Sequence, residues 1–166
     1  MRMSVLLAAA LSTFSFVQFA AADASDNLDV SATVAASCTI TGGNLSFGTY
    51  NTVSGAQVDS TAILTVACTS GTDTTLTLGE GTHPDGASTP DLPARRMNDG
   101  GANFLSYSLF SDAQRTTVWG NSPGSARGYL ALSSAQANLS VFGRITASQD
   151  VPAGTYTDTV LATIAF

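Results

Sequence analysis

The chain has 166 residues, which is the length of one domain or of two very small ones. Hydrophobic residues make up 44% and charged residues only 11%, so the chain can fill a core and is not a disordered tail. The net charge is -6 and there is no lysine, so the clustered cations that bind nucleic acids or anionic membranes are missing. A Ser-, Thr- and Gly-rich, charge-poor chain of this kind is typical of an exported all-β protein.

Residues 1–22 have the pattern of a secretory signal peptide. A short positive start is followed by an apolar run, and small residues then offer cleavage sites after Ala22 or Ala24. A transmembrane anchor is the rival interpretation, but Ser, Thr and Gln interrupt the run and small residues end it. We therefore predict that the signal peptide is removed and exclude it from the fold.

Cys38 and Cys68 are the two cysteines of the chain. In an oxidising compartment such a pair forms a disulfide, and closing a loop of this size stabilises the fold by about 3–4 kcal/mol. A metal site would need more ligands than these two thiols and the single His83 supply. The sequence therefore predicts a structural disulfide and no metal centre.

The mature chain begins with a long alternating segment. Leu28, Val30, Ala32 and Val34 fall on one face with Ala36 and Cys38, whereas polar residues fall on the other. This period of two predicts a strand with one apolar edge. The glycines at 42 and 43 then predict a turn, and residues 45–47 a short strand.

Further strands are predicted at 61–69, 73–78, 95–97, 104–111, 117–119, 138–145 and 156–166. The last strand would point an apolar set inward, namely Tyr156, Val160, Ala162, Ile164 and Phe166. A Gly-, Pro- and Asp-rich loop is expected at 79–93, and no segment has convincing helical periodicity. Short strands with turns between them predict a single all-β sandwich domain.

Catalytic chemistry finds little support in the sequence. Residues 120–124 match the G-x-S-x-G pattern around Ser122, but a Pro-Gly turn follows and the His that a triad needs downstream is missing. His83 shares a polar loop with Glu80 and Asp85, which we expect to be solvated. The pair Arg95-Arg96 is expected to bind carboxylates or to cover apolar surface with its stems. We expect no enzymatic activity, cofactor, nucleic-acid partner or small-molecule substrate.

The chain resembles the spore coat protein U domain family, which includes the subunits of archaic (Csu-type) chaperone–usher pili. The matching stretches follow in the expected order over nearly all of the mature chain: Ser37–Ile40, Phe47–Tyr50, Leu64–Cys68, Arg95–Met97, Leu105–Asp112, Arg115–Gly120, Val141–Arg144 and Val151–Val160. Each stretch is a weak signal by itself, but the ordered set is specific.

The resemblance implies an immunoglobulin-like β-sandwich that lacks its final strand, which would follow Phe166 where this chain stops. A neighbouring subunit would fill the gap by donor-strand complementation. The implied organisation is a signal peptide (1–22), a donor-strand extension (23–36) and a pilin-like domain (37–166). Leu28, Val30, Ala32 and Val34 would fill the groove. Before assembly a periplasmic chaperone would occupy it and bind the last strand, and an outer-membrane usher would follow.

The resulting hypothesis is a structural subunit of an extracellular fibre at the cell surface, exported through the periplasm. It would polymerise with identical or related subunits by donor-strand exchange and support adhesion or biofilm formation. Two alternatives stay open: a surface- or glycan-binding minor or tip subunit, and a coat protein that completes its own domain. The alternation of residues 28–34 does not say whether the segment acts on its own domain or on another copy.

Overall fold

The computed structural model describes residues 22–166 and divides the chain into two units, Met1–Thr33 and Val34–Phe166. The signal peptide predicted for residues 1–22 lies, apart from Ala22, outside the described residues. Residues 22–33 of the first unit contain no helix or strand, and all of them are exposed. No helix of the described chain is long and apolar enough to cross a membrane.

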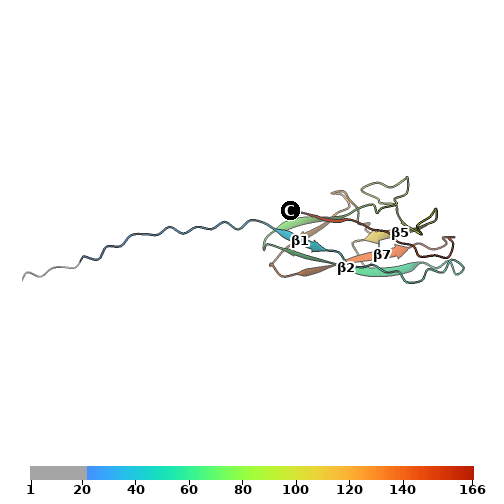
Figure 1. Cartoon of the computed structure of the whole chain (residues 1–166), viewed down its shortest axis with the longest axis horizontal. Coiled ribbons are helices and arrows are strands. Elements are labelled where there is room, and N and C mark those ends of the chain that lie inside the picture. Colours follow the sequence, from blue (N-terminus) through green and yellow to red (C-terminus); the bar gives the residue numbers. More distant parts are fainter. Residues whose placement is uncertain (1–21) are drawn as a thin grey trace, which may run out of the picture. The chain divides into compact units, whose positions relative to one another are not determined.

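The second unit is an all-β sandwich with the architecture expected of an immunoglobulin-like domain, and the described residues contain no helix. Its strands are β1 (Cys38–Thr41), β2 (Val58–Cys68), β3 (Asp73–Leu78), β4 (Arg95–Asn98), β5 (Phe104–Phe110), β6 (Arg127–Leu130), β7 (Ala137–Ile145) and β8 (Ala162–Ala165). One sheet has the order β1-β2-β7-β5-β4 and the other β6-β3-β8, and all named ladders are antiparallel. Figure 1 shows β1, β2, β7 and β5 of the larger sheet.

The core lies between the inner faces of the two sheets. Alternate residues of β2, β5 and β7 point inward from the larger sheet, and Leu76 and Leu78 face them from β3. Trp119 is fully buried between the sheets, and its indole N–H donates to the carbonyl oxygen of Leu76 at 3.0 Å. The strands predicted at 61–69, 73–78, 104–111 and 138–145 are confirmed as β2, β3, β5 and β7, with differences at their ends.

Some predicted elements differ from the structure. The strand predicted from Leu28 begins only at Cys38, and residues 45–47 and 117–119 form no strand, although Val118 makes an isolated bridge to Phe110. The strand predicted at 156–166 shortens to β8, with a single bridge from Thr157 to Asn98 before it. The sequence interpretation missed β6, whose glycine at 128 is atypical of a strand.

Candidate functional site

An open groove of about 1350 Å³ runs along one side of the sandwich. Residues 42–52 form one wall, and residues 151–162 form the other. The floor is apolar and belongs to the inner face of the larger sheet, with Leu105, Leu109, Val141 and Ile145. The sandwich therefore exposes part of its core along this line, which is unusual for a domain that buries its own apolar face.

The first wall is held by its side chains rather than by its main chain. Leu45 and Phe47 pack over Gly143 of β7, where an added Cβ would lie 2.9 Å from both. The ring of Phe47 also meets that of Tyr107 edge-on, with centroids 6.0 Å apart. Within the described chain, no hydrogen bond joins the main chain of residues 42–50 to the main chain of another segment. This missing partner explains why residues 45–47 are not a strand.

The second wall contains three of the five inward residues predicted near the C-terminus. Tyr156, Val160 and Ala162 line the groove, and Ile164 packs against the core from β8. Phe166, by contrast, is 60% exposed. Strand β8 is an edge of its sheet and pairs only with β3, so its opposite main-chain edge lacks a strand partner in the described structure. The first wall and the free edge of β8, which continues from the second wall, thus offer main-chain groups to an added strand.

A polar cluster interrupts the apolar lining. Asp158 accepts hydrogen bonds from the hydroxyl of Tyr107 at 2.6 Å, and from the main-chain N–H and hydroxyl of Thr82 at 2.8 and 2.6 Å. Burial and the hydrogen bond to Asp158 both raise the pKa of Tyr107, so the phenol stays protonated and donates. Gly81 has a φ of +86° and leaves room for the Asp158 carboxylate. The cluster fixes the wall next to the floor.

Arg95 is a structural residue that the sequence interpretation placed wrongly. Its side chain is buried and donates three hydrogen bonds of 2.8 Å, to the carbonyl oxygens of Leu78, Gly79 and Trp119. Burial lowers the pKa of its guanidinium to about 10, so it remains charged at neutral pH. Arg95 therefore ties β4 to the end of β3 across the core, which no local pattern in the sequence indicated.

Arg96 does what was expected of both arginines. It forms a salt bridge of 3.0 Å with Asp85, and its guanidinium lies 4.3 Å above the centre of the Phe104 ring. The ring of His83 lies 3.0 Å from the hydroxyl of Thr82 and packs beside the Phe104 ring, with centroids 6.1 Å apart. Residues 79–93 form a loop, as predicted, and Arg96 holds it against β5.

Ser122 and His83 are the residues that the sequence analysis weighed and rejected as a nucleophile and a metal ligand. Ser122 lies in the turn expected at 120–124, hydrogen-bonded to Asp91 and 3.1 Å from the hydroxyl of Ser125. Among the described residues there is no group of three or more His, Cys, Asp or Glu side chains that could hold a metal ion.

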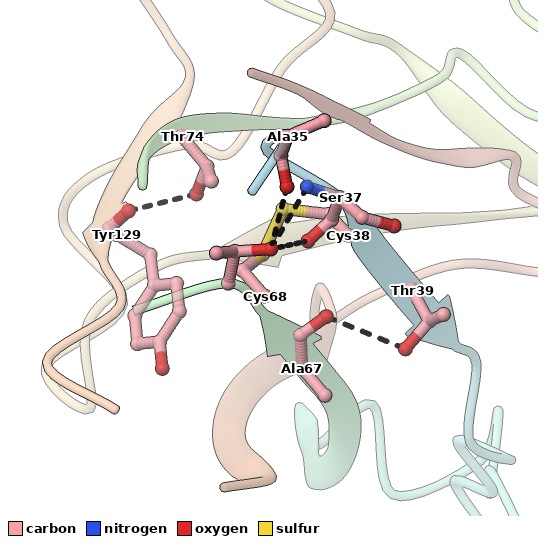
Figure 2. The surroundings of a disulfide bond; sticks show 9 residues. Ala35, Ser37, Cys38, Thr39, Ala67, Cys68, Thr74 and Tyr129 are labelled. Carbon is pink, nitrogen blue, oxygen red and sulfur yellow. Dashed lines mark hydrogen bonds between the residues drawn. A yellow bond between two sulfur atoms is a disulfide. The ribbon is translucent and has the colours of Figure 1, made fainter. Parts of the chain in front are cut away.

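The predicted donor residues lie outside any strand. Leu28, Val30 and Val34 are 87%, 86% and 81% exposed, and Ala32 is exposed as well. An apolar alternation left in water needs an explanation, because the same pattern in β2 is buried. The disulfide between Cys38 and Cys68 is confirmed and joins the first pair of the β1–β2 ladder (Figure 2).

Comparison with known protein families shows to which family the chain belongs. The model of the Spore Coat Protein U domain matches residues 24–163. The chain belongs to the spore coat protein U domain family. Protein U of Myxococcus xanthus is 39% identical over 168 residues, which cover 95% of this chain and 93% of that protein. The match begins at Ala24, before the sandwich, and extends to Thr163 in β8.

A solved structure with the same fold comes from the archaic chaperone–usher Csu pili of Acinetobacter baumannii. It is a chaperone–tip adhesion subunit pre-assembly complex of CsuC and CsuE, and it matches with a TM-score of 0.57 and 26% identity. The match covers 81% of this chain but only 40% of the other, so the present chain spans less than half of that protein. Family and fold are therefore those of structural pilus and coat proteins.

Proposed function

We propose that this protein is a structural subunit of an extracellular pilus or coat that polymerises by donor-strand exchange. Residues 1–22 direct export, residues 23–36 are the donor extension, and residues 37–166 are the pilin-like domain. The extension of one copy fills the groove of the next, with Leu28, Val30, Ala32 and Val34 facing the floor. The polymer lies at the cell surface and supports adhesion or biofilm formation.

The observation that carries the proposal is the open groove. Its floor is apolar, and its first wall and the free edge of β8 present main-chain groups without strand partners. Residues 26–36 are an exposed segment of matching character, with apolar side chains on one face only. Burying Leu28, Val30 and Val34 would contribute about 5–8 kcal/mol, at 1.5–3 kcal/mol each, and main-chain hydrogen bonds would fix the register.

The end of the donor segment, residues 35–37, favours insertion into the groove of a neighbouring copy over insertion into the groove of the same molecule. Both Ala35 and Ser37 are within hydrogen-bond distance of the Thr69 hydroxyl, which holds the chain just before β1. A segment that folded back into its own groove would have to reverse within residues 35–37. Residues 35–37 are held at the Thr69 hydroxyl, so such a reversal would compete with these bonds. The segment therefore suits a groove on another molecule.

A chaperone and an usher are part of the same proposal. The match to a chaperone–subunit complex supports a periplasmic chaperone that occupies the groove before assembly. The wall formed by Tyr156, Val160 and Ala162, together with Ile164 and Phe166 of the last strand, is the proposed chaperone contact. An outer-membrane usher would then exchange the chaperone for the next subunit.

Gel migration of the exported protein tests the proposal. Unboiled wild-type protein should give a ladder of SDS-resistant oligomers that collapses to monomer on boiling. Val30→Asp should abolish the ladder, because it places a charge against an apolar floor. Ser31→Asp adds the same charge one residue away, on the opposite face of the segment, and should leave the ladder intact.

Two outcomes would contradict donor-strand exchange. One is a folded wild-type protein that migrates only as monomer when its chaperone and usher are present. The other is a ladder that Val30→Asp and Ser31→Asp weaken equally, because the face of the segment would then not matter.

A tip or minor subunit is the second candidate, because the solved relative is a tip adhesion subunit. The present chain carries an exposed alternating extension of its own, which suits a subunit inside the fibre better. Immunogold labelling along the whole fibre would support the first candidate. Labelling confined to the fibre end would support the second.

A further inference from the structure

The point where the donor segment joins the sandwich is fastened twice. The main-chain N–H of Ser37 donates to the Thr69 hydroxyl at 3.1 Å, and the N–H of Thr69 donates to the carbonyl oxygen of Ser37 at 2.9 Å. The Thr69 hydroxyl also lies 3.3 Å from the carbonyl oxygen of Ala35. One residue later the disulfide joins Cys38 to Cys68 (Figure 2). Hydrogen bonds and a disulfide therefore both hold the chain at the point where the donor segment ends and β1 begins.

The structure immediately beyond this point is weak. Strand β1 has only four residues and lies at the edge of its sheet, paired with β2 alone. The next segment, residues 42–50, is the groove wall, whose main chain makes no hydrogen bond to the main chain of another described segment. A pull on residue 37 would therefore peel β1 from β2 and then draw out the wall.

Strand β2 is a much stronger attachment. It has eleven residues, pairs with β1 on one side and β7 on the other, and buries Leu64 and Val66 in the core. Cys68 is its last residue and is buried. Through the disulfide, a pull on residue 37 passes directly into this central strand. The disulfide closes a ring of residues 38–68, which contains both β1 and the wall. Force that passes through the disulfide does not pass along the main chain of this ring.

We propose that the disulfide and Thr69 form a mechanical anchor, which shields the groove wall from tension carried by the subunit's own donor segment. This inference rests on the proposed function, because only a fibre loads the donor segment. In such a fibre each subunit is pulled at its root while its groove holds the donor of another copy. The anchor lets the subunit carry the first load without loosening its hold on that donor.

Pulling on single fibres in an optical trap tests the anchor. The comparison is between wild-type fibres and fibres of the double variant Cys38→Ser, Cys68→Ser. Subunits of the variant should begin to unfold at a lower force than wild-type subunits. Each unfolding step should also add more length to the fibre. The disulfide spans 30 residues, and their release adds about 100 Å of chain. Thr69→Val should lower the force at which the first event occurs without changing its length.

A stability-matched control separates the anchor from a general loss of stability. Leu76→Ala removes buried core volume in β3, outside the ring of residues 38–68. It should lower the melting temperature, as loss of the disulfide does, without adding the extra length. If the double variant does not assemble, wild-type fibres are reduced after assembly, and alkylation of the two thiols verifies the reduction.

The outcomes distinguish the anchor from the fibre hypothesis itself. Fibres that extend by the same length at the same force with and without the disulfide would overturn the anchor and leave donor-strand exchange standing. A wild-type protein that forms no fibre overturns the proposed function instead. Extra length that appears equally in Leu76→Ala fibres would also overturn the anchor.

Discussion

Two segments of this protein have the same alternating pattern and opposite surroundings. In β2, Leu64, Val66 and Cys68 point into the core, whereas Leu28, Val30 and Val34 are exposed to solvent. The difference lies in their partners: β2 pairs with β1 and β7, and residues 28–34 pair with no strand of the described chain. Alternation therefore specifies which side chains share a face, and a neighbouring strand decides whether that face is buried.

The largest expected effect is the difference in monomer stability between an Asp substitution at Val66 and the same substitution at Val30. Val66→Asp should destabilise the monomer by more than about 4 kcal/mol, because it buries an unpaired charge in the core. Val30→Asp should leave the urea unfolding midpoint of the monomer unchanged. A similar loss for both variants would mean that the segment packs within its own domain, and the comparison would fail.

The two adjacent arginines of β4 give the next largest effect. Arg95→Met should lower the free energy of unfolding by about 2–3 kcal/mol, since it removes the hydrogen bonds of three carbonyl groups near the core. Arg96→Met is the matched control, because its salt bridge with Asp85 is partly exposed and contributes about 0–1 kcal/mol. Urea unfolding of both variants measures the difference. Equal losses would show that Arg95 does not join the two sheets.

Gly143 tests whether the groove wall depends on packing against the floor. Gly143→Ala would place a methyl group against Leu45 and Phe47 and should cost about 1–3 kcal/mol. Because those side chains hold the wall, the SDS-resistant ladder should weaken as well. Gly128→Ala in β6 is the control, since the nearest atom to its added Cβ is 4.0 Å away. A lowered melting temperature of Gly143→Ala together with an unchanged SDS-resistant ladder would show that donor binding does not depend on this wall.

How far the sequence predicts this molecule depends on where each partner lies. Strands β2, β3, β5 and β7 follow from their own patterns, because their partners are in the same chain. Residues 45–47 have strand-like residues but no main-chain partner, and they do not form a strand. Only the family resemblance predicted the groove, because a strand that is absent from the chain leaves no residue pattern in its sequence.

Arg95 shows a second limit of sequence interpretation. Adjacent arginines look equivalent in a list of residues, yet alternation along β4 sends one side chain into the core and the other onto the surface. The inward arginine finds its partners on β3 and at Trp119, far along the chain. Such long-range main-chain partners have no local signature, so burial of Arg95 could not be predicted without the sheet order.

The smallest expected effect concerns the outer face of β2, where Asp59 joins this strand to β7. Arg144 donates two hydrogen bonds to Asp59, at 2.7 and 2.9 Å, and this pairing lowers the pKa of the carboxyl group. A carboxyl with a lowered pKa in the folded state stabilises the fold above its unfolded value of about 3.9, and the contribution disappears as the pH falls through the folded pKa.

Asp59→Asn should therefore cost no more than about 1 kcal/mol at pH 7, because the pair is partly exposed. The stability difference from wild type should stay constant between about pH 5 and 8 and shrink below about pH 4. Urea unfolding across this range measures it, and Arg144→Gln should give a smaller loss with the same pH dependence, because Arg115 still lies 3.5 Å from Asp59. A difference that persists at pH 2 would show that Asp59 acts through packing and not through its charge. The outer face of β2 would then be joined to its neighbour, like the inner face, by contacts that are independent of pH.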